Sequence, residues 1–571
     1  MVKIKRYKTS FYIFFYGIIR MVKYMKKNSF VEGTVIAYIS ILITKIIGAI
    51  YVIPFYKIIG TDGGVLYSYA YNVYNLFLNI SISGIPTAVA IIIAEYNALK
   101  KFNDREKTFH LANKIIGIVA IICFLLMFIF AKYIGLFFVG DLENGTDVNS
   151  IVLVVRTISF CLLIIPFLSV LRGYLQGNKY LNDPSYSQLI EQIARIIVVL
   201  VGSYVAINLL HYSIPIGVSV ALSGTVIGGI CAFLFLRIRL SKSRLQLKEG
   251  VTSLKDSSEN DKKIIGKIIK YSIPIIIVAV TQNIYEITDQ KLIIKGLYII
   301  GYTATKSEYL ASIVVTWTPK ICMIINALAI GLCTSVIPFV VTSFTEKKFD
   351  ELNRKFNQAI NIILTVSIPL SACLIVFASE VYRIFYGTST EGKYVLMVMS
   401  ITSILFSLQL VINMILQGMK KFKLVYINTL TGIAINIVLD IPMILLLNKT
   451  IIPPYLGSLF ATMTGLFISE LIVAIALRKE FSFKYRTIVS TLFKSILGTL
   501  VMAGVLILIK KFLFTTLINR WLLIGEVGII CLAGVGIYLL IGKFTGLIDE
   551  VLGKDFFNKI ISKFKRGKKN E

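Results

Sequence analysis

The sequence predicts an all-α integral membrane protein with about fourteen transmembrane helices, arranged as two pseudo-symmetric six-helix bundles around a central cavity plus two C-terminal helices. Composition is the first reason: 56% of the 571 residues are hydrophobic and 16% are charged, whereas soluble domains carry about 25% charged residues. The mean hydropathy is +0.80. Apolar runs of roughly 20 residues recur along the whole chain. A polar turn motif that returns at half-chain distance is the third reason.

The recurring motif leads from one apolar run into a helix with a polar face. It reads LRGYLQG at Leu171–Gly177 and LQGMKKF at Leu416–Phe422. Behind the first copy, polar residues spaced i, i+3, i+4 and i+7 share one helix face: Gln188, Glu191, Gln192 and Arg195. Behind the second copy stand Asn428, Thr431, Asn436 and Asp440. Two related bundles that face each other across a polar interior are typical of a transporter.

Each expected span is bounded by charged residues, proline or glycine, with boundaries accurate to a few residues. We expect the spans at 32–54, 66–95, 113–139, 151–171, 186–209, 214–236, 266–294, 309–341, 357–378, 394–417, 424–447, 452–477, 488–514 and 520–542. The segments 66–95 and 309–341 are longer than the hydrocarbon layer is thick, so they are expected to tilt, kink or project into water.

The loops between the spans alternate in charge. Most Lys and Arg residues lie in every second loop, at 96–113, 172–185, 237–265, 342–356, 418–423 and 478–487. The loop at 140–150 instead holds Asp141, Glu143 and Asp147. Because basic loops stay in the cytoplasm, this alternation places both termini on the cytoplasmic side of the cell membrane. The net charge of +30 is therefore assigned to topology and anionic lipids, and nucleic acid is not expected as a partner.

The longest polar interruption divides the chain into parts. We expect a basic cytoplasmic or interfacial N-terminus at 1–29, an N-terminal six-helix bundle at 30–236, a cytoplasmic linker at 237–265, a C-terminal six-helix bundle at 266–477, two additional transmembrane helices at 478–542 and a basic cytoplasmic tail at 543–571. The tail alternates Phe and Ile with Lys, which favours contact with the anionic inner leaflet. Either Met1 or Met25 is the first residue, and no signal-peptide cleavage site is recognisable.

Several classes of chemistry are not expected. The seven cysteines stand singly in apolar runs and there are two histidines, so neither a disulfide nor a zinc or haem site is predicted. The sequence has no Walker A motif, which argues against ATP hydrolysis by this chain. We therefore predict a protein that is not an enzyme and that uses no cofactor.

Polar and ionisable residues inside the apolar runs are the candidate site residues, because a charge at the bilayer centre costs about 2.5–3.5 kcal/mol. In the first bundle Lys45 lies deep in its run, with snorkelling to an interface as the alternative. Asn75 and Asn79 share one face ahead of a Gly–Pro break, which is either a packing kink or part of a cavity wall. Glu191 and Arg195 lie one turn apart and form either a substrate contact or a structural latch.

In the second bundle Glu286 and Asp289 lie on one helix face, and Lys320 follows Pro319 deep inside its run. Cations that converge with Lys320 would suit a phosphate or pyrophosphate group. A coupling cation or proton would bind at Glu286 or Asp289. Basic residues at loop mouths, such as Arg172, are assigned to topology and left out of the site.

Three stretches carry a resemblance to a known family: Ile46–Tyr96, Leu171–Arg195 and Ser367–Gly387. They resemble the polysaccharide-biosynthesis branch of the multidrug/oligosaccharidyl-lipid/polysaccharide (MOP) flippases, in particular the stage V sporulation protein B group, which is related to the MurJ-type lipid II flippases. The resemblance implies a lipid-tail groove along the last two helices and flipping of an undecaprenyl-diphosphate-linked saccharide by alternating access. It also implies cationic substrate contacts at Lys45, which stands where MurJ-type members carry an arginine, and at Lys320, which lies near the position of a second such arginine.

Two other functions stay open at this point. A cation-coupled multidrug antiporter of the same fold would favour a more acidic cavity lined with aromatic residues. A membrane-bound glycan polymerase or transferase would need a sizeable outer loop or an acidic metal-binding motif, and the outer loops here are short. The expected partners are a lipid-linked saccharide, membrane lipids of the anionic inner leaflet, and a coupling cation or proton.

Overall fold

The computed structural model describes residues 44, 47, 48, 50–242, 257–334, 337–513 and 520–552, which form helices, turns and loops without a β-strand. The first part comprises α3 (Val52–Ile82), α4 (Ile85–Ala98), α5 (Phe102–Ile129), α6 (Ala131–Val139), α7 (Val148–Ser159), η1 (Phe160–Leu163), α8 (Ile165–Gly177), α9 (Asn182–Ile197), η2 (Val198–Gly202), η3 (Val205–Leu209) and α10 (Ile214–Lys242).

The second part begins with one long helix and ends with two helices and a short terminal turn. It comprises α12 (Asp261–Ile299), α13 (Ala304–Ser312), η5 (Ile313–Trp317), α14 (Thr318–Thr334), α15 (Ile337–Thr345), α16 (Phe349–Val376), α17 (Ala378–Tyr386), α18 (Thr390–Gly418), α19 (Phe422–Leu447), η6 (Pro454–Leu456), α20 (Gly457–Phe481), α21 (Arg486–Leu513), α22 (Arg520–Phe544) and α23 (Leu547–Leu552).

Among the described residues, 13 helical segments are long and apolar enough to cross a membrane. They correspond one by one to the expected spans from 66–95 to 520–542, so the all-α membrane fold is confirmed. Most of the expected span at 32–54 lies outside the described residues. The protein is therefore a multi-pass membrane protein.

Both segments expected to kink are interrupted. The first breaks between α3 and α4, where Pro86 stands in the first turn of α4. A Cβ atom on Gly84 would lie 2.4 Å from the carbonyl oxygen of Ser272 in α12, so the missing side chain lets the two backbones meet. The second segment is interrupted by the π-helical turn η5 between α13 and α14.

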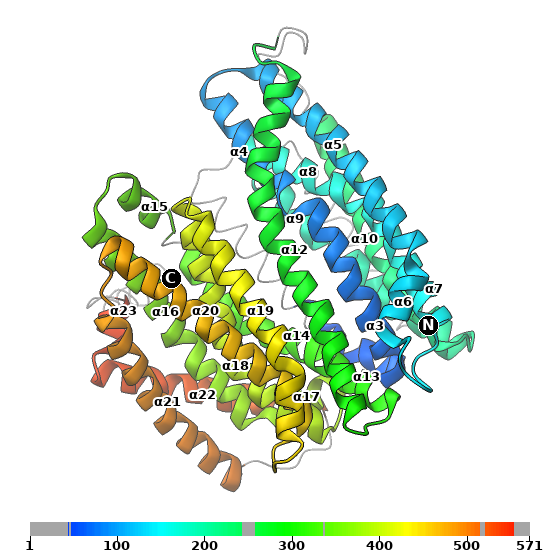
Figure 1. Ribbon diagram of the computed structural model, residues 1–571, viewed down its shortest axis with the longest axis vertical. Coiled ribbons are helices and arrows are strands. Elements are labelled where there is room, and N and C mark those ends of the chain that lie inside the picture. The colour runs from blue at the N-terminus through cyan, green and yellow to red at the C-terminus, as the bar shows by residue number, and fades with distance from the viewer. Residues whose placement is uncertain are drawn as a thin grey trace, which may run out of the picture.

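Helices α3–α10 pack on one another as a first lobe, and α13–α20 pack as a second lobe, with α21 against α16 and α22 against α21. Figure 1 shows the first lobe in blue and cyan and the second in green, yellow and orange. Helix α12 contacts α3, α4 and α5 of the first lobe and α19 of the second. It therefore lies between the lobes along its length.

The two lobes repeat the same helix-ending turn. Lys100 and Lys179 in the first lobe and Lys347 and Lys420 in the second all adopt left-handed φ values, between 56° and 67°. At each of the four, the lysine N–H donates to the carbonyl oxygen three residues earlier. Lys179 and Lys420 each stand two residues after the Leu-Gln-Gly sequence of the recurring motif. The repeat inferred from sequence thus has a structural counterpart.

The lobes meet at one end of the molecule and diverge at the other (Figure 1). At the closed end, the indole N–H of Trp317 donates to the carbonyl oxygen of Gly64 over 3.3 Å, and the Tyr69 hydroxyl donates to Glu308 over 2.9 Å. The lobes stand apart at the end where α10 finishes and α12 begins. We call these the closed end and the open end.

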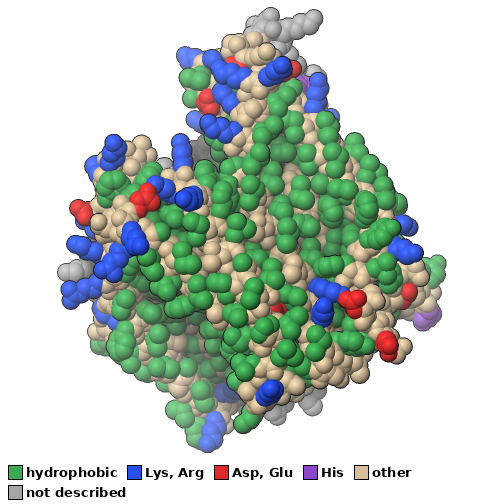
Figure 2. Space-filling model, viewed as in Figure 1, with side chains coloured by type: hydrophobic (Ala, Val, Ile, Leu, Met, Phe, Trp, Pro, Cys, Tyr) green, Lys and Arg blue, Asp and Glu red, His purple; other side chains and the backbone are tan. Residues whose placement is uncertain are grey.

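The outer surface is typical of a protein that faces lipid. Figure 2 shows apolar side chains over the middle of the molecule, with Lys, Arg, Asp and Glu gathered toward its ends. Helix α5 is an example, because Ile118, Ile121 and Leu125 are all exposed. Such a band would be unstable in water, and a bilayer provides the apolar surroundings it needs.

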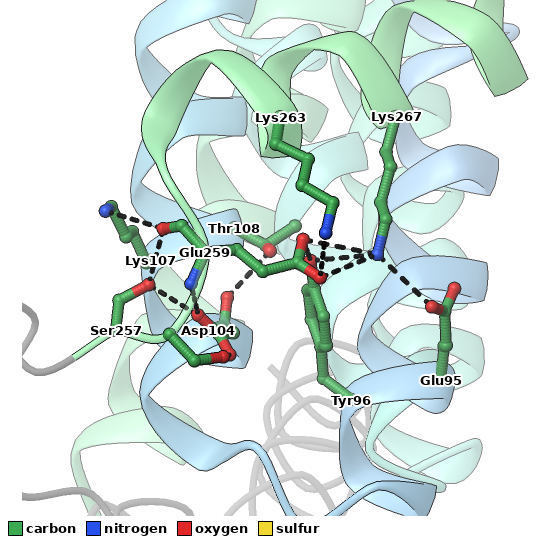
Figure 3. A network of polar contacts seen from close by, with 10 residues as sticks. Glu95, Tyr96, Asp104, Lys107, Thr108, Ser257, Glu259, Lys263 and Lys267 are labelled. Atoms are coloured by element: carbon green, nitrogen blue, oxygen red, sulfur yellow. Dashed lines mark hydrogen bonds and ion pairs between the residues drawn. The ribbon is translucent and has the colours of Figure 1, made fainter.

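A polar cluster fixes the beginning of α12 to the first lobe at the open end (Figure 3). The buried Glu259 carboxylate accepts a hydrogen bond from the Tyr96 hydroxyl over 2.6 Å and lies 3.3 Å from the Lys267 ammonium nitrogen. Asp104 accepts from the Ser257 hydroxyl over 2.5 Å and from the Glu259 N–H over 3.0 Å. Burial alone would raise the pKa of Glu259, but the hydrogen bonds from Tyr96 and Lys267 lower it.

Candidate functional site

Lys320 lies in α14 at the surface that meets the first lobe. Its ammonium nitrogen is buried and makes no hydrogen bond with the described residues. Instead it lies over three aromatic rings, 4.2 Å from the ring centroid of Trp317, 4.3 Å from Tyr67 and 5.3 Å from Tyr71. Cation–π contacts of this kind stabilise an ammonium group but leave its charge uncompensated.

Local backbone features place these rings around Lys320. The π-helical turn η5 inserts an extra residue into the helix ahead of α14 and ends at Trp317. On the facing helix α3, a Cβ atom on Gly64 would lie 3.2 Å from the indole nitrogen, so glycine makes room for the ring. The Tyr386 hydroxyl donates to the Trp317 carbonyl oxygen over 2.7 Å and holds the turn from the side of α17.

A second cationic group lies in the first lobe. The Glu191 carboxylate accepts from the Arg195 guanidinium over 2.7 Å and from the Arg172 guanidinium over 2.9 Å. Arg172 also donates to the Ser187 hydroxyl over 2.8 Å. The side chains of Arg172 and Glu191 are each 13% exposed. Two guanidinium groups share one carboxylate, so the group carries one excess positive charge.

Small residues on the neighbouring helix determine where this group lies. A Cβ atom on Gly228 of α10 would lie 2.6 Å from the carbonyl oxygen of Glu191, and one on Gly224 would lie 2.9 Å from that of Arg195. Glycines four residues apart let two membrane helices approach closely. These two close contacts fix the position of the polar residues of α9 along the axis of α10.

The two cationic groups share a pair of tyrosines. The rings of Tyr67 and Tyr71 stack with centroids 5.2 Å apart, and both lie beneath Lys320. Arg195 interacts electrostatically with the same two residues. Lys320 and Arg195 therefore approach one aromatic pair on α3 from the second and the first lobe.

The structure describes two of the three other residues proposed for the first bundle. Lys45 lies outside the described residues. Asn75 is half-buried on α3, and Asn79 accepts a hydrogen bond from the Ser83 hydroxyl at the end of the same helix over 3.0 Å. Neither asparagine is hydrogen-bonded to Arg195 or Lys320 within the described part of the chain.

The second lobe contains a buried acidic pair. Asp289 of α12 and Asp440 of α19 interact directly with each other, and the Asp440 oxygens accept no hydrogen bond from the described residues. The Asn436 amide nitrogen lies 3.5 Å from Asp289 and 3.0 Å from the hydroxyl oxygen of Thr462. Adjacent carboxylates repel unless a proton or a cation lies between them. Oxygen ligands of this kind suit a small hard cation.

A cavity of about 230 Å³ adjoins the acidic pair. Glu286 and Asp289 both line it, as expected from their shared helix face, together with Gln282, Asn326 and Gln409. Cys322 of α14 lines the same cavity, so α14 presents Cys322 to the acidic side and Lys320 to the cationic side. Lys320 therefore faces Tyr67 and Tyr71 on one side of α14, whereas Glu286 and Asp289 line the cavity on the other side.

Sequence reasoning overlooked two of these residues. Arg172 was assigned to topology because it follows an apolar run, but the structure pairs it with Glu191. Asp440 was recognised as polar but was not included in the site. Its i, i+4 spacing from Asn436, inside an otherwise apolar helix, was the signal that would have identified it.

A lateral cavity of about 210 Å³ lies between the second lobe and α21. Its lining is mainly apolar and includes Phe356, Ile412, Phe467 and Ile488. Glu470 is the exception, with one carboxylate oxygen buried and no hydrogen bond from the described residues. Of the two C-terminal helices along which the resemblance implies a lipid-tail groove, α21 lines this cavity and the described residues of α22 do not.

Two lobes around a polar interior, with ionisable residues buried in membrane-spanning helices, define a membrane transporter. The model of the polysaccharide biosynthesis protein family matches residues 30–315, just over half of the chain. The protein belongs to this family. A second family model, MatE, matches residues 274–441.

Known relatives agree with this assignment. The chain is 27% identical over 544 residues to the lipid II flippase MurJ of Bacillus subtilis (strain 168), covering 93% of this chain and 99% of that protein. It is 23% identical over 409 residues to stage V sporulation protein B of the same organism, covering 72% and 76%. A solved structure of the lipid II flippase MurJ in an inward closed conformation superposes with a TM-score of 0.62 at 16% identity, covering 90% of this chain and 99% of that one. The resemblance seen in the sequence is confirmed.

Proposed function

We propose that this transporter flips an undecaprenyl-diphosphate-linked saccharide, such as lipid II or a polysaccharide precursor, across the cell membrane for cell-envelope biosynthesis. The observation that carries the proposal is the buried Lys320 ammonium, which has no anionic partner among the described residues. A buried charge without a partner is costly. A diphosphate would supply the missing negative charge and would also accept hydrogen bonds from Arg195.

The lateral cavity supports the same substrate class. A polyprenyl chain is wholly apolar and needs an apolar path alongside the transporter while its head group crosses. The cavity between α20 and α21 offers such a surface, and it lies on the second lobe, as does Lys320. The relatives named above include a protein described as a lipid II flippase.

The direction of the open end supports alternating access. The acidic loop that contains Asp141 lies at the closed end, where Lys291 pairs with Asp141 over 3.0 Å. The basic turns at Lys100 and Lys347 lie at the open end, which we assign to the cytoplasm together with both termini. The lobes, taken as the predicted six-helix bundles, would then accept the substrate from the inner leaflet and reopen outward.

The acidic pair is the proposed coupling site. A cation or proton bound at Asp289 and Asp440 would remove their repulsion, and Glu286 lines the cavity next to them. Movement of that ion down its gradient would then drive the return of the empty transporter.

Transport of a fluorescent undecaprenyl-diphosphate saccharide in proteoliposomes tests the proposal. We expect flipping by the wild type, loss of flipping in Lys320→Ala and in Lys45→Ala, and partial recovery in Lys320→Arg because the charge is retained. Lys420→Ala is the matched control, since Lys420 is an exposed lysine at a loop mouth. Unchanged flipping in Lys320→Ala and Lys45→Ala would remove both residues from the site.

A cation-coupled multidrug antiporter is the second candidate. The match of residues 274–441 to the MatE model and the acidic cavity of the second lobe favour it. An antiporter would exchange an organic cation for Na⁺ or a proton in the same proteoliposomes. Exchange of this kind without flipping of any lipid-linked saccharide in a tested panel would favour this function over the first.

A further inference from the structure

Four polar side chains form a closed ring of hydrogen bonds between the lobes. The Asn72 amide of α3 donates to the Gln290 carbonyl of α12 over 2.8 Å, and the Gln290 amide donates to the Ser68 hydroxyl over 3.0 Å. Ser68 and Thr316 of η5 share a hydrogen bond of 2.5 Å, and Asn72 also donates to Thr316 over 3.2 Å. All four side chains are at most 4% exposed.

This ring is complete only while the lobes are together. Ser68 and Asn72 belong to the first lobe, Thr316 belongs to the second, and Gln290 lies on the helix between them. Separation of the lobes at this end breaks every bond between them at once, and the exposed groups must then bind water. A buried polar network of this type holds one arrangement specifically, because partial opening leaves its members unsatisfied.

The ring lies next to both proposed binding sites. Gln290 directly follows Asp289, and successive residues of an α-helix point about 100° apart. Asp289 therefore faces the acidic pair in the second lobe, while Gln290 faces the first lobe. Thr316 directly precedes Trp317, whose ring covers Lys320. Any movement of α12 or η5 at either site acts on the ring.

Helix α12 is attached to both lobes, which lets it transmit such a movement. Its beginning is bound to the first lobe through Lys267, which lies 3.2 Å from Glu95. Its second half packs on the second lobe, where Gly296 receives the Ile444 side chain and the Tyr285 hydroxyl lies 2.6 Å from the Thr462 hydroxyl. Pro274 lies between these attachments and removes a backbone hydrogen bond, which makes bending easier there.

We propose that Ser68, Asn72, Gln290 and Thr316 form the lock that keeps the closed end shut, and that Gln290 is the positioning residue through which the charge at Asp289 acts on this lock. The proposal deepens the proposed function and rests on its coupling site. Neutralisation of Asp289 lets α12 settle against α19 and draws Gln290 away from Asn72. The lock weakens, and the closed end opens.

Distances between spin labels in the full chain in nanodiscs test this inference. Labels at Asn144 and Thr388 report the closed end, and labels at Lys100 and Lys347 report the open end, since all four positions are exposed. The seven native cysteines are replaced by alanine in every sample, in a background that keeps its thermal stability. The distance measurements use no lipid substrate, so their result does not depend on the outcome of the flippase assay.

We expect Gln290→Ala and Asn72→Ala to increase severalfold the population with a long Asn144–Thr388 distance. Asn283→Ala is the matched control, because this buried amide of α12 donates only to the Ala279 carbonyl of its own helix among the described residues. Its distances should equal those of the wild type. Unchanged distances in Gln290→Ala and Asn72→Ala, or an equal change in Asn283→Ala, would overturn the lock.

The role of Gln290 is tested by combining substitutions. Asp289→Asn imitates the neutralised site whichever ion binds there, and we expect it to lengthen the Asn144–Thr388 distance in the wild type and in Asn283→Ala. In Gln290→Ala the same substitution should add nothing, because two residues that act through one contact are not additive. No effect of Asp289→Asn in the wild type, or a full additional effect in Gln290→Ala, overturns the assignment of Gln290.

Discussion

In the first lobe the Glu191 carboxylate lies between two guanidinium groups, whereas in the second lobe the Asp289 and Asp440 carboxylates face each other. No basic side chain of the described residues forms an ion pair with Asp289 or Asp440. The first site has an excess of positive charge and the second an excess of negative charge. Each imbalance is of the sign that the proposed ligand of that site would neutralise.

The difference shows two ways of holding charge in a membrane protein. A buried ion costs several kcal/mol unless a partner offsets the lost hydration. In the first lobe the partner is part of the chain, so the charges are held permanently. In the second lobe the missing partner is a mobile ion or a proton, so the stability of the site depends on the solution. Loss of a carboxylate should therefore have opposite effects in the two lobes.

Glu191→Gln should give the largest effect on stability. It leaves Arg172 and Arg195 buried without a negative partner, and breaking a buried pair in this way costs about 3–5 kcal/mol. Thermal unfolding in detergent measures the loss. Glu480→Gln is the control, because the pair of Glu480 with Lys421 is 43% and 31% exposed and an exposed pair contributes about 0–1 kcal/mol. Equal losses in the two variants would contradict the comparison.

Asp440→Asn should act in the opposite direction. Asp440 is 0% exposed, and its carboxylate lies next to that of Asp289. The substitution removes one of these two carboxylates and so relieves their repulsion. We expect the free energy of unfolding to rise by about 0.5–3 kcal/mol, the usual range of single substitutions. The stabilisation of the wild type by the coupling ion should disappear in the same variant. A loss of stability in Asp440→Asn would show that the pair is satisfied within the chain.

The fold was predictable because membrane-spanning helices can be recognised from the local amino-acid composition. Thirteen spans were located from apolar runs, and the excess length of the segments 66–95 and 309–341 indicated that they would tilt, kink or project into water. The positions of Glu286 and Asp289 beside one cavity followed from helical periodicity alone. These features depend on residues close together in the sequence.

What could not be predicted depends on contacts between distant helices. Arg172 resembles a loop residue until α9 folds back and places Glu191 beside it. Lys320 faces Tyr67 of the first lobe, whereas Cys322 of the same helix faces the cavity that Glu286 lines. The π-helical turn η5 that precedes this helix has no marker in the sequence. Asn72 was overlooked in favour of Asn75 because its partner Gln290 is far away in the chain. Sequence periodicity identifies a polar face but not the face it meets.

The junction at the start of α12 offers a pH-dependent test that is independent of both sites. Burial alone would raise the pKa of Glu259, but its hydrogen bonds keep the pKa in the folded protein below its ordinary value. The contribution of Glu259 to stability is therefore present at neutral pH and is lost as the pH falls through that lowered pKa. We expect hydrogen exchange at residues 257–268, corrected for the intrinsic rate, to rise severalfold there. In Glu259→Gln this step should be absent while the remaining acid titration persists. An identical pH profile in the variant would assign the step to another carboxylate.

The smallest effect concerns what the lobes share, namely their lysine turns. Lys179 and Lys420 adopt left-handed φ values of 67° and 57°, a conformation that costs a side-chain-bearing residue about 1–2 kcal/mol and glycine nearly nothing. Lys179→Gly and Lys420→Gly should each raise stability by at most about 1 kcal/mol, because the greater freedom of glycine in the unfolded chain offsets part of the gain. Lys423→Gly, at an exposed helical position in α19, should instead lower stability by about 1 kcal/mol. Equal gains in stability from Lys179→Gly and Lys420→Gly would confirm that the two lobes repeat the same backbone turn. Stability changes of opposite sign would show that the two lobes share only the sequence motif and not the turn.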